Sequence, residues 1–178
     1  MRNGFFLRPL LAACTAALLW GGAPLAFPAS ADPAPIKIAV FDFELDDFSA
    51  GAGIAGNPVA DLAQLDRATG EARRVISVSG RYSLVDVSSA EGEGVKSRSL
   101  RQCNGCEAAI ALKLGADQSF VGVVTRISRT EYTVRFQVRD ARTGAPVIAR
   151  QSDLRIGADY SWNRGAASLI KSSLLDNR

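Results

Sequence analysis

The chain has 178 residues, and 21 lysines and arginines against 18 aspartates and glutamates give it a formal net charge of +3. It contains no histidine, which excludes Ser-His-Asp and Cys-His catalysis, histidine zinc sites and histidine pH switches. Its length suits one domain with its own hydrophobic core.

The first 31 residues have the composition of a secretory signal peptide. Two arginines precede an apolar run, Leu10–Phe27, and Ala29-Ser30-Ala31 supplies a small-x-small cleavage pattern. We therefore expect residues 1–31 to be removed and residues 32–178 to form a single periplasmic domain without a transmembrane span. Lipidation at Cys14, which ends the sequence Leu-Ala-Ala-Cys, is the alternative.

Loss of this leader changes the charge and the cysteine content of the protein. Arg2 and Arg8 leave with it, so the net charge falls from +3 to +1, and the loss of Cys14 leaves two cysteines. So small a net charge gives no electrostatic reason to expect a nucleic-acid partner.

Strands and helices alternate along the mature chain. Ile36–Leu45 is rich in β-branched and aromatic residues, which predicts a buried first strand. Asn57 and Pro58 suit the cap and the first turn of a helix that continues to about Val78. Ser88–Gln102 is polar and contains glycine, so it is predicted to be a loop.

The remaining segments complete a mixed sheet with helices packed on it. In Glu131–Asp140 apolar and polar residues alternate strictly, which predicts a strand with one solvated face. The other predicted strands are Tyr82–Val87, Gln118–Ser128 and Pro146–Ile156, and the other predicted helices are Glu107–Leu114 and a segment from Trp162 onward. The order β-α-β-α-β-β-β-α predicts an α/β (α+β) single domain, with a mixed five-stranded sheet and about three helices.

A glycine-rich stretch follows the first strand. Gly51, Gly53 and Gly56 form the pattern G-x-G-x-x-G, which can hold a pyrophosphate when it opens a helix directly after a strand. Here further residues intervene on both sides, and the acidic residues just upstream would repel a phosphate. We therefore predict a loop and no nucleotide or other cofactor.

Those upstream carboxylates form a candidate cation site. Asp42, Glu44 and Asp46 are spaced by two, so in one continuous strand they share a side, and clustered oxygens suit a hard cation such as Ca²⁺. Against this, the chain has no twelve-residue calcium loop, and Arg135 or Arg139 could pair with them across the sheet.

The sequence CNGC at residues 103–106 is a second candidate site. Two cysteines without histidine cannot supply the four ligands of a closed zinc site. In an oxidising compartment Cys103 and Cys106 should form a disulfide. Asn104 and Glu107 resemble a capping box, which would place Cys106 in the first helical turn, where the helix dipole stabilises a thiolate. A structural disulfide and a redox centre both remain open.

The aromatic segment near the C-terminus has two interpretations. Tyr160, Trp162 and Arg164 are residue types enriched in interaction hot spots, so they could line a partner groove. Alternatively Trp162 packs in the core and Arg164 faces solvent.

Five segments carry a resemblance to a known family. They are IAVFDFEL at 38–45, CNGC at 103–106, LGAD at 114–117, RDARTG at 139–144 and SWNRGAASLIKSSLL at 161–175. Together they resemble an uncharacterised family of secreted proteobacterial proteins, a domain of unknown function. The resemblance implies an exported single domain, supports the pairing of the two cysteines and supplies no activity. At the level of fold, the chain also resembles the N-terminal domain of TolB and CsgG-like domains, envelope proteins that bind other proteins.

These observations predict a non-catalytic binding or accessory protein of the periplasm, with an envelope protein as its partner. The sequence favours no enzymatic activity. The predicted partner surface consists of Asp47, Gly51, Gly53, Gly56, Tyr160, Trp162 and Arg164. The alternatives are a thiol-disulfide redox protein that uses Cys103 and Cys106, and a carboxylate-based cation binder.

Overall fold

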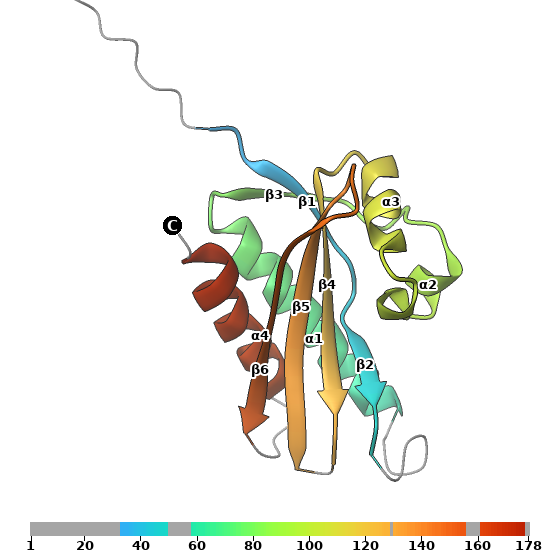
Figure 1. Cartoon of the computed structure of the whole chain (residues 1–178). Helices are drawn as coiled ribbons and strands as arrows, with labels where there is room; N and C mark the ends of the chain where they lie inside the picture. The colour runs from blue at the N-terminus through green and yellow to red at the C-terminus, as the bar shows by residue number, and fades with distance from the viewer. Residues whose placement is uncertain (1–32, 50–57, 129, 156–160, 177–178) are drawn as a thin grey trace, which may run out of the picture. The chain divides into compact units, whose positions relative to one another are not determined.

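One mixed β-sheet organises the computed structural model of the chain (Figure 1). The structure describes residues 33–176 apart from 50–57, 129 and 156–160. Within these residues the strands are β1 (Ile36–Val40), β2 (Glu44–Asp47), β3 (Tyr82–Val85), β4 (Gln118–Arg126), β5 (Glu131–Asp140) and β6 (Pro146–Arg155).

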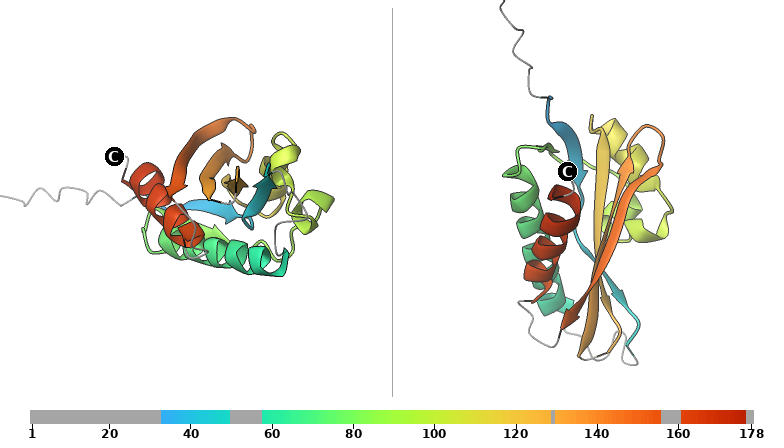
Figure 2. Two further views of the ribbon diagram at one scale, coloured as in Figure 1. Left: turned by 90° about the horizontal axis from the view of Figure 1, so that it is seen from below. Right: turned by 60° about the vertical axis from the view of Figure 1, so that its left-hand side comes forward.

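Helices cover both faces of this sheet. They are α1 (Pro58–Ser77), α2 (Glu93–Lys96), the 3₁₀ turn η1 (Leu100–Gln102), α3 (Cys106–Lys113), α4 (Ser161–Ile170) and its π-helical continuation η2 (Lys171–Leu175). The helices α1 and α4 lie side by side on one face, and α2 and α3 lie on the other (Figures 1 and 2). No helix in the described part of the chain is long and apolar enough to cross a membrane.

The strand order is β3-β1-β4-β5-β6, and β2 also pairs with β4. β1 is parallel to both β3 and β4, because helical segments connect these strands, whereas β4, β5 and β6 form an antiparallel meander joined by tight turns. β6 is therefore the edge strand at the end of the meander. The class and the mixed sheet agree with the sequence prediction.

The main core lies between the sheet and the helix pair α1 and α4. Apolar residues of α1 recur at helical spacing and meet the inward side chains of β1, β4 and β5 there. The buried α1 residues in this core are Leu65, Ala68, Ala72, Val75 and Ile76. A smaller core on the opposite face contains Ala39, Phe41, Leu100, Ala111, Ala116, Val121, Val123 and Ala141.

The first strand is not continuous, which corrects the prediction of one strand over Ile36–Leu45. Val40 lies opposite Phe120 and Glu44 lies opposite Val123, so the first strand has one extra residue, as in a β-bulge. An extra residue reverses which side chains face each core. Ile38 and Val40 face the main core before the break, and Phe43 and Leu45 face it afterwards.

Two further predictions were wrong in detail. Ser88–Gln102 contains α2 and η1 in addition to loop. The helix α3 begins at Cys106 with Gly105 as its N-cap at φ 109°, and no side chain caps it. Asn104 takes a positive φ of 49°, so the capping box predicted from Asn104 and Glu107 does not form.

Candidate functional site

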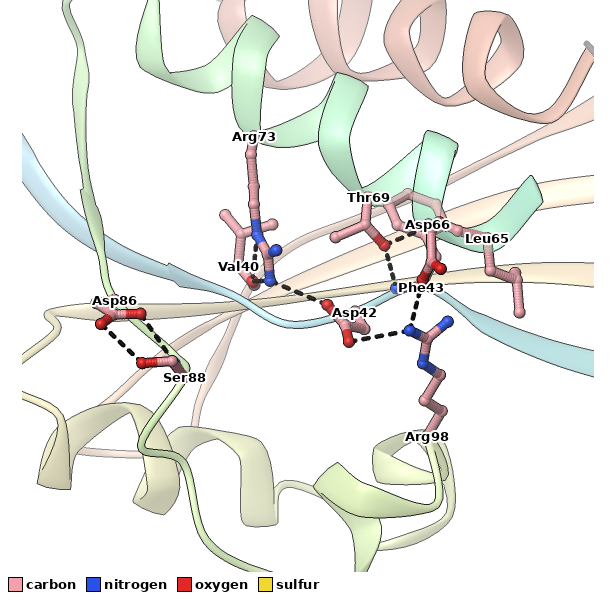
Figure 3. Close-up of polar contacts among 10 residues, drawn as sticks. All are labelled: Val40, Asp42, Phe43, Leu65, Asp66, Thr69, Arg73, Asp86, Ser88 and Arg98. Carbon is pink, nitrogen blue, oxygen red and sulfur yellow. Dashed lines mark hydrogen bonds and ion pairs between the residues drawn. The ribbon is translucent and has the colours of Figure 1, made fainter. Parts of the chain in front are cut away.

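The bulge between β1 and β2 is held by two side chains of α1 (Figure 3). Phe43 N donates to Thr69 Oγ1 at 2.9 Å, and Arg73 Nη2 donates to Val40 O at 2.8 Å. These are backbone groups that the interrupted ladder leaves without a strand partner. Since Thr69 and Arg73 are four residues apart, they project from the same face of the helix. The bulge is therefore a supported feature that sets where the following carboxylates point.

Asp42 lies within the bulge, between two arginines (Figure 3). Its carboxylate oxygens are 3.0 Å from Arg73 Nη2 and 3.2 Å from Arg98 Nη2. Arg98 also pairs with Asp66 at 2.6 Å, so the cluster links β1, α1 and the segment between α2 and η1.

Glu44 and Asp46 contact η1 and the strand β5. The Glu44 side chain is fully buried and accepts hydrogen bonds from Leu100 N at 2.5 Å, Arg101 N at 3.1 Å and Arg101 Nη1 at 3.0 Å. Asp46 lies 3.5 Å from Arg101 Nε and 3.4 Å from Arg135 Nη2. The sequence-based suggestion that Arg135 pairs with these carboxylates is confirmed.

The structure does not bring Asp42, Glu44 and Asp46 into one cluster of ligands. Within the described residues, three potential metal ligands lie close together only at Cys103, Cys106 and Glu107. The sulfur atoms of Cys103 and Cys106 are bonded to each other in a disulfide. Asp42 pairs with Arg73 and Arg98, whereas Glu44 and Asp46 share Arg101, so each carboxylate already contacts at least one guanidinium group.

Calcium is expected to leave the melting temperature of the protein unchanged. Arginines neutralise the three carboxylates, so a divalent ion would have to displace existing ion pairs before it could coordinate oxygen. Thermal melts with and without millimolar Ca²⁺ test this. A stabilisation that disappears in Asp42→Asn would contradict the expectation and restore the cation hypothesis.

Asp47 is also engaged in an ion-pair network. Arg126 of β4 contacts Asp47 at 2.9 Å and Asp61 of α1 at 2.5 Å, and its guanidinium lies over the Tyr132 ring. Partial desolvation acts to raise the pKa of Asp47, but hydrogen bonds from Ser49 and Arg126 outweigh it and hold the pKa below its ordinary value. The network fastens β2, β4 and α1 together at this end of the sheet.

The contribution of Asp47 to stability is expected to vanish in acid. A carboxyl whose folded-state pKa is lowered stabilises the protein above its unfolded-state pKa of about 3.9, and this is lost as the pH falls through the folded-state value. The difference in unfolding free energy between the wild type and Asp47→Asn should therefore shrink below about pH 4. Urea titrations at neutral and acidic pH measure it, and a pH-independent difference would refute the assignment.

Cys103 and Cys106 form a disulfide with a Cα–Cα distance of 5.5 Å. Cys103 follows η1 directly and Cys106 is the first residue of α3, so the bond fixes how the chain turns from one into the other. Both cysteines are half-buried against the smaller core. While it is oxidised, the pair cannot ligate a metal through thiolates.

Removal of the disulfide in Cys103→Ser/Cys106→Ser is expected to cost roughly 2 kcal/mol, because so short a ring restricts the unfolded chain only modestly. Urea unfolding of the variant, compared with the wild type in the absence and presence of reductant, measures the loss. A loss above about 4 kcal/mol would show that the bond holds more than the local turn.

An open groove lies between the η1–α3 segment and the β5–β6 hairpin. Its volume is about 420 Å³, within the usual range for ligand sites. Its lining residues are Leu100, Arg101, Asn104, Gly105, Glu107, Val121, Val123, Arg135, Phe136, Gln137, Arg139, Ala149, Arg150 and Gln151. The sequence predicted the polar side of β5 and the CNGC loop separately, but it did not predict that the two lie next to each other and line one groove.

The remaining residues of the predicted partner surface are placed as follows. Trp162 is 3% exposed and packs against Tyr132 with ring centroids 5.8 Å apart, as its core interpretation expects. Arg164 is exposed on α4. Gly51, Gly53, Gly56 and Tyr160 lie outside the described residues.

Residues 36–174 match the family DUF3280, described as "Protein of unknown function (DUF2380)". The chain belongs to this family. The membership confirms the resemblance to a domain of unknown function that the sequence motifs indicate. No curated protein matches the chain.

Solved structures with a similar chain trace come from bacterial proteins. The LpoB C-terminal domain from Salmonella enterica is 14% identical with a TM-score of 0.49, over 71% of this chain and 87% of that one. The PelC dodecamer from Paraburkholderia phytofirmans is 18% identical with a TM-score of 0.44, over 80% and 88%. TolB from Acinetobacter baumannii is 15% identical with a TM-score of 0.42, over 80% of this chain and 29% of that one. At these identities the likeness concerns the fold alone.

Proposed function

We propose that the protein is an exported, non-catalytic accessory protein of the bacterial cell envelope that acts by binding another protein. One observation carries the proposal. The groups best suited to chemistry are already engaged, the strand-end carboxylates with arginines and the two cysteines with each other, while the groove beside them is open. This arrangement supports recognition over catalysis.

Export to the periplasm is supported by the leader and the disulfide. Residues 1–31 have the basic head, apolar middle and small-residue end of a signal peptide, and disulfides persist in oxidising compartments. Labelling with a radioactive fatty acid distinguishes the alternative, since only lipidation at Cys14 would retain label in the processed protein and lose it in Cys14→Ser.

Site-specific photo-crosslinking tests the binding function. A crosslinking residue at Gln151, on the rim of the groove, should give a discrete adduct with an envelope protein in intact cells. The same residue at Ser83, exposed on β3 at the other edge of the sheet, is the matched control. A protein confined to the cytoplasm, or one that gives no adduct either at Gln151 or at the exposed Phe48, would contradict the proposal.

The partner surface predicted from the sequence is a second place for contact. Phe48 is 70% exposed immediately after Asp47, beside the glycine-containing segment. If a crosslinking residue at Phe48 gives an adduct and one at Gln151 does not, the partner binds at this end of the sheet and not in the groove.

Thiol-disulfide exchange is the second candidate function. It is favoured by the position of Cys106, the first residue of α3, next to the solvent-facing turn that carries Cys103. A redox protein should trap mixed disulfides when the resolving cysteine is removed, through Cys106 in Cys103→Ser or through Cys103 in Cys106→Ser. The binding proposal expects no trapped partner and a disulfide that resists mild reductant.

A further inference from the structure

The groove exists because only half of one sheet face is covered. On the side of η1 and α3, these short elements pack over β1, β2 and β4, and they leave the outward side chains of β5 and β6 open. The register aligns Val121, Gln137 and Ala149 in one row across β4, β5 and β6, and Val123, Arg135 and Gln151 in the next. These two rows form the floor of the groove, which is apolar at β4 and polar at β5, and η1 and the start of α3 form one wall.

Positive charge dominates the lining of this groove. It contains four arginines, Arg101, Arg135, Arg139 and Arg150, and one carboxylate, Glu107. Two of the arginines are engaged, since Arg101 pairs with the buried Glu44, and Arg139 lies within ion-pair distance of Glu107 and donates from Nη1 to Gly144 O. Among the described residues Arg150 contacts no carboxylate and donates to Ala149 O.

Arg135 is held loosely. Its side chain is 44% exposed, its Nη2 lies 3.4 Å from an Asp46 oxygen, and Arg101 competes for the same carboxylate. Its Nε is buried and has no hydrogen-bond acceptor among the described residues. The Nη end of this guanidinium group can donate to an incoming carboxylate, and this would displace only the long 3.4 Å contact with Asp46.

We propose that the groove binds an extended acidic segment of a partner protein, and that Arg135 forms an ion pair with a carboxylate of that segment. This inference rests on the proposed binding function and names the chemistry of the partner. Gln137, Gln151 and Asn104 supply amide donors and acceptors for the peptide backbone, and Val121, Val123 and Leu100 supply apolar contact. The buried Glu107 in the wall disfavours a dense polyanion such as nucleic acid.

Fluorescence anisotropy with a labelled acidic pentapeptide, Gly-Glu-Val-Glu-Gly, tests the inference on the full-length protein. The wild type should bind it, should prefer it over Gly-Gln-Val-Gln-Gly, and should bind less tightly as salt rises from about 0.1 M to 1 M. Arg135→Gln should weaken binding about tenfold or more, because a charge-assisted contact is lost. Arg142→Gln, which removes an exposed arginine from the β5–β6 turn, should leave it within about twofold.

A second variant keeps the test independent of folding defects. Gln151 is exposed and lies directly opposite Arg135 on β6, so Gln151→Glu should pair with Arg135 and weaken peptide binding without removing a contact from the core. Inorganic phosphate and acetate as competitors distinguish a peptide site from a general anion site. Equal affinity for the acidic and amide peptides, or displacement by phosphate at concentrations that displace the peptide, overturns the inference.

The outcomes also separate this inference from the function on which it rests. If the wild type gives the Gln151 crosslink to an envelope protein but does not bind the acidic peptide, the protein has a partner of other chemistry and the inference is wrong. If neither crosslink nor peptide binding is observed, the proposed binding function at this groove fails as well.

Discussion

Replacement of Glu44 by alanine is expected to lower the free energy of unfolding by about 3–5 kcal/mol, the range for breaking a buried ion pair by removal of one partner. The Glu44 carboxylate is fully buried and accepts three hydrogen bonds from Leu100 and Arg101. Without it two backbone N–H groups lose their acceptor, and the Arg101 guanidinium keeps only its contacts with Asp46 and Arg98 O. The η1 segment, which carries the disulfide and one wall of the groove, would then lose its attachment to the sheet.

Urea unfolding measures this loss, with Glu131→Ala at an exposed strand position as the control, expected within about 0.5 kcal/mol of the wild type. In a double-mutant cycle with Arg101→Ala the two losses should not add, because both remove the same interaction. A loss below about 1 kcal/mol for Glu44→Ala would mean that the pair contributes little and that packing holds η1 in place.

Gly122→Ala is expected to cost about 3 kcal/mol, the upper end of the range for overpacking a core. A Cβ atom at Gly122 would lie closer than 3.0 Å to three ring atoms of Phe43. That ring is 1% exposed and packs near Phe120, with ring centroids 6.2 Å apart, so it has little room to shift. Phe43 lies over Gly122 because the bulge turns it toward the main core.

The matched control is the same substitution in open space. A Cβ at Gly70 in α1 meets nothing within 4 Å, so Gly70→Ala should stabilise the protein by roughly 0.5–1 kcal/mol through helix propensity. Phe43→Leu should partly rescue Gly122→Ala, because the smaller side chain makes room for the added methyl group. Equal effects of the two glycine substitutions would show that the Phe43 ring does not constrain this position.

The sequence predicts the elements whose patterns are local. The strict alternation from Glu131 to Asp140 predicts β5 with the bounds that the structure has. The predicted helix from Pro58 to about Val78 ends one residue later than α1. In both segments periodicity depends on neighbours along the chain, so the sequence carries nearly all of the information.

The elements that the sequence missed depend on distant residues. The bulge after Val40 is stabilised by Thr69 and Arg73 of α1, which are about thirty residues away. The sequence does contain a signal for this bulge, because the large apolar residues of the main core occupy even positions up to Val40 and odd positions at Phe43 and Leu45. The start of α3 at Cys106, one residue before the predicted Glu107, has a local cause instead: Gly105 at positive φ and the disulfide, rather than the Asn104 side chain.

The sequence by itself determined the mixed α/β class, the solvated side of β5 and the absence of histidine chemistry, because composition and periodicity are properties of the chain alone. Only the tertiary structure decided that a bulge interrupts the first strand, that arginines pair with the three carboxylates, and that the CNGC turn and the arginines of β5 line one groove. The reason is physical. Ion pairs and grooves form between residues far apart in the sequence, and a single extra residue in a strand reverses the direction of every side chain after it.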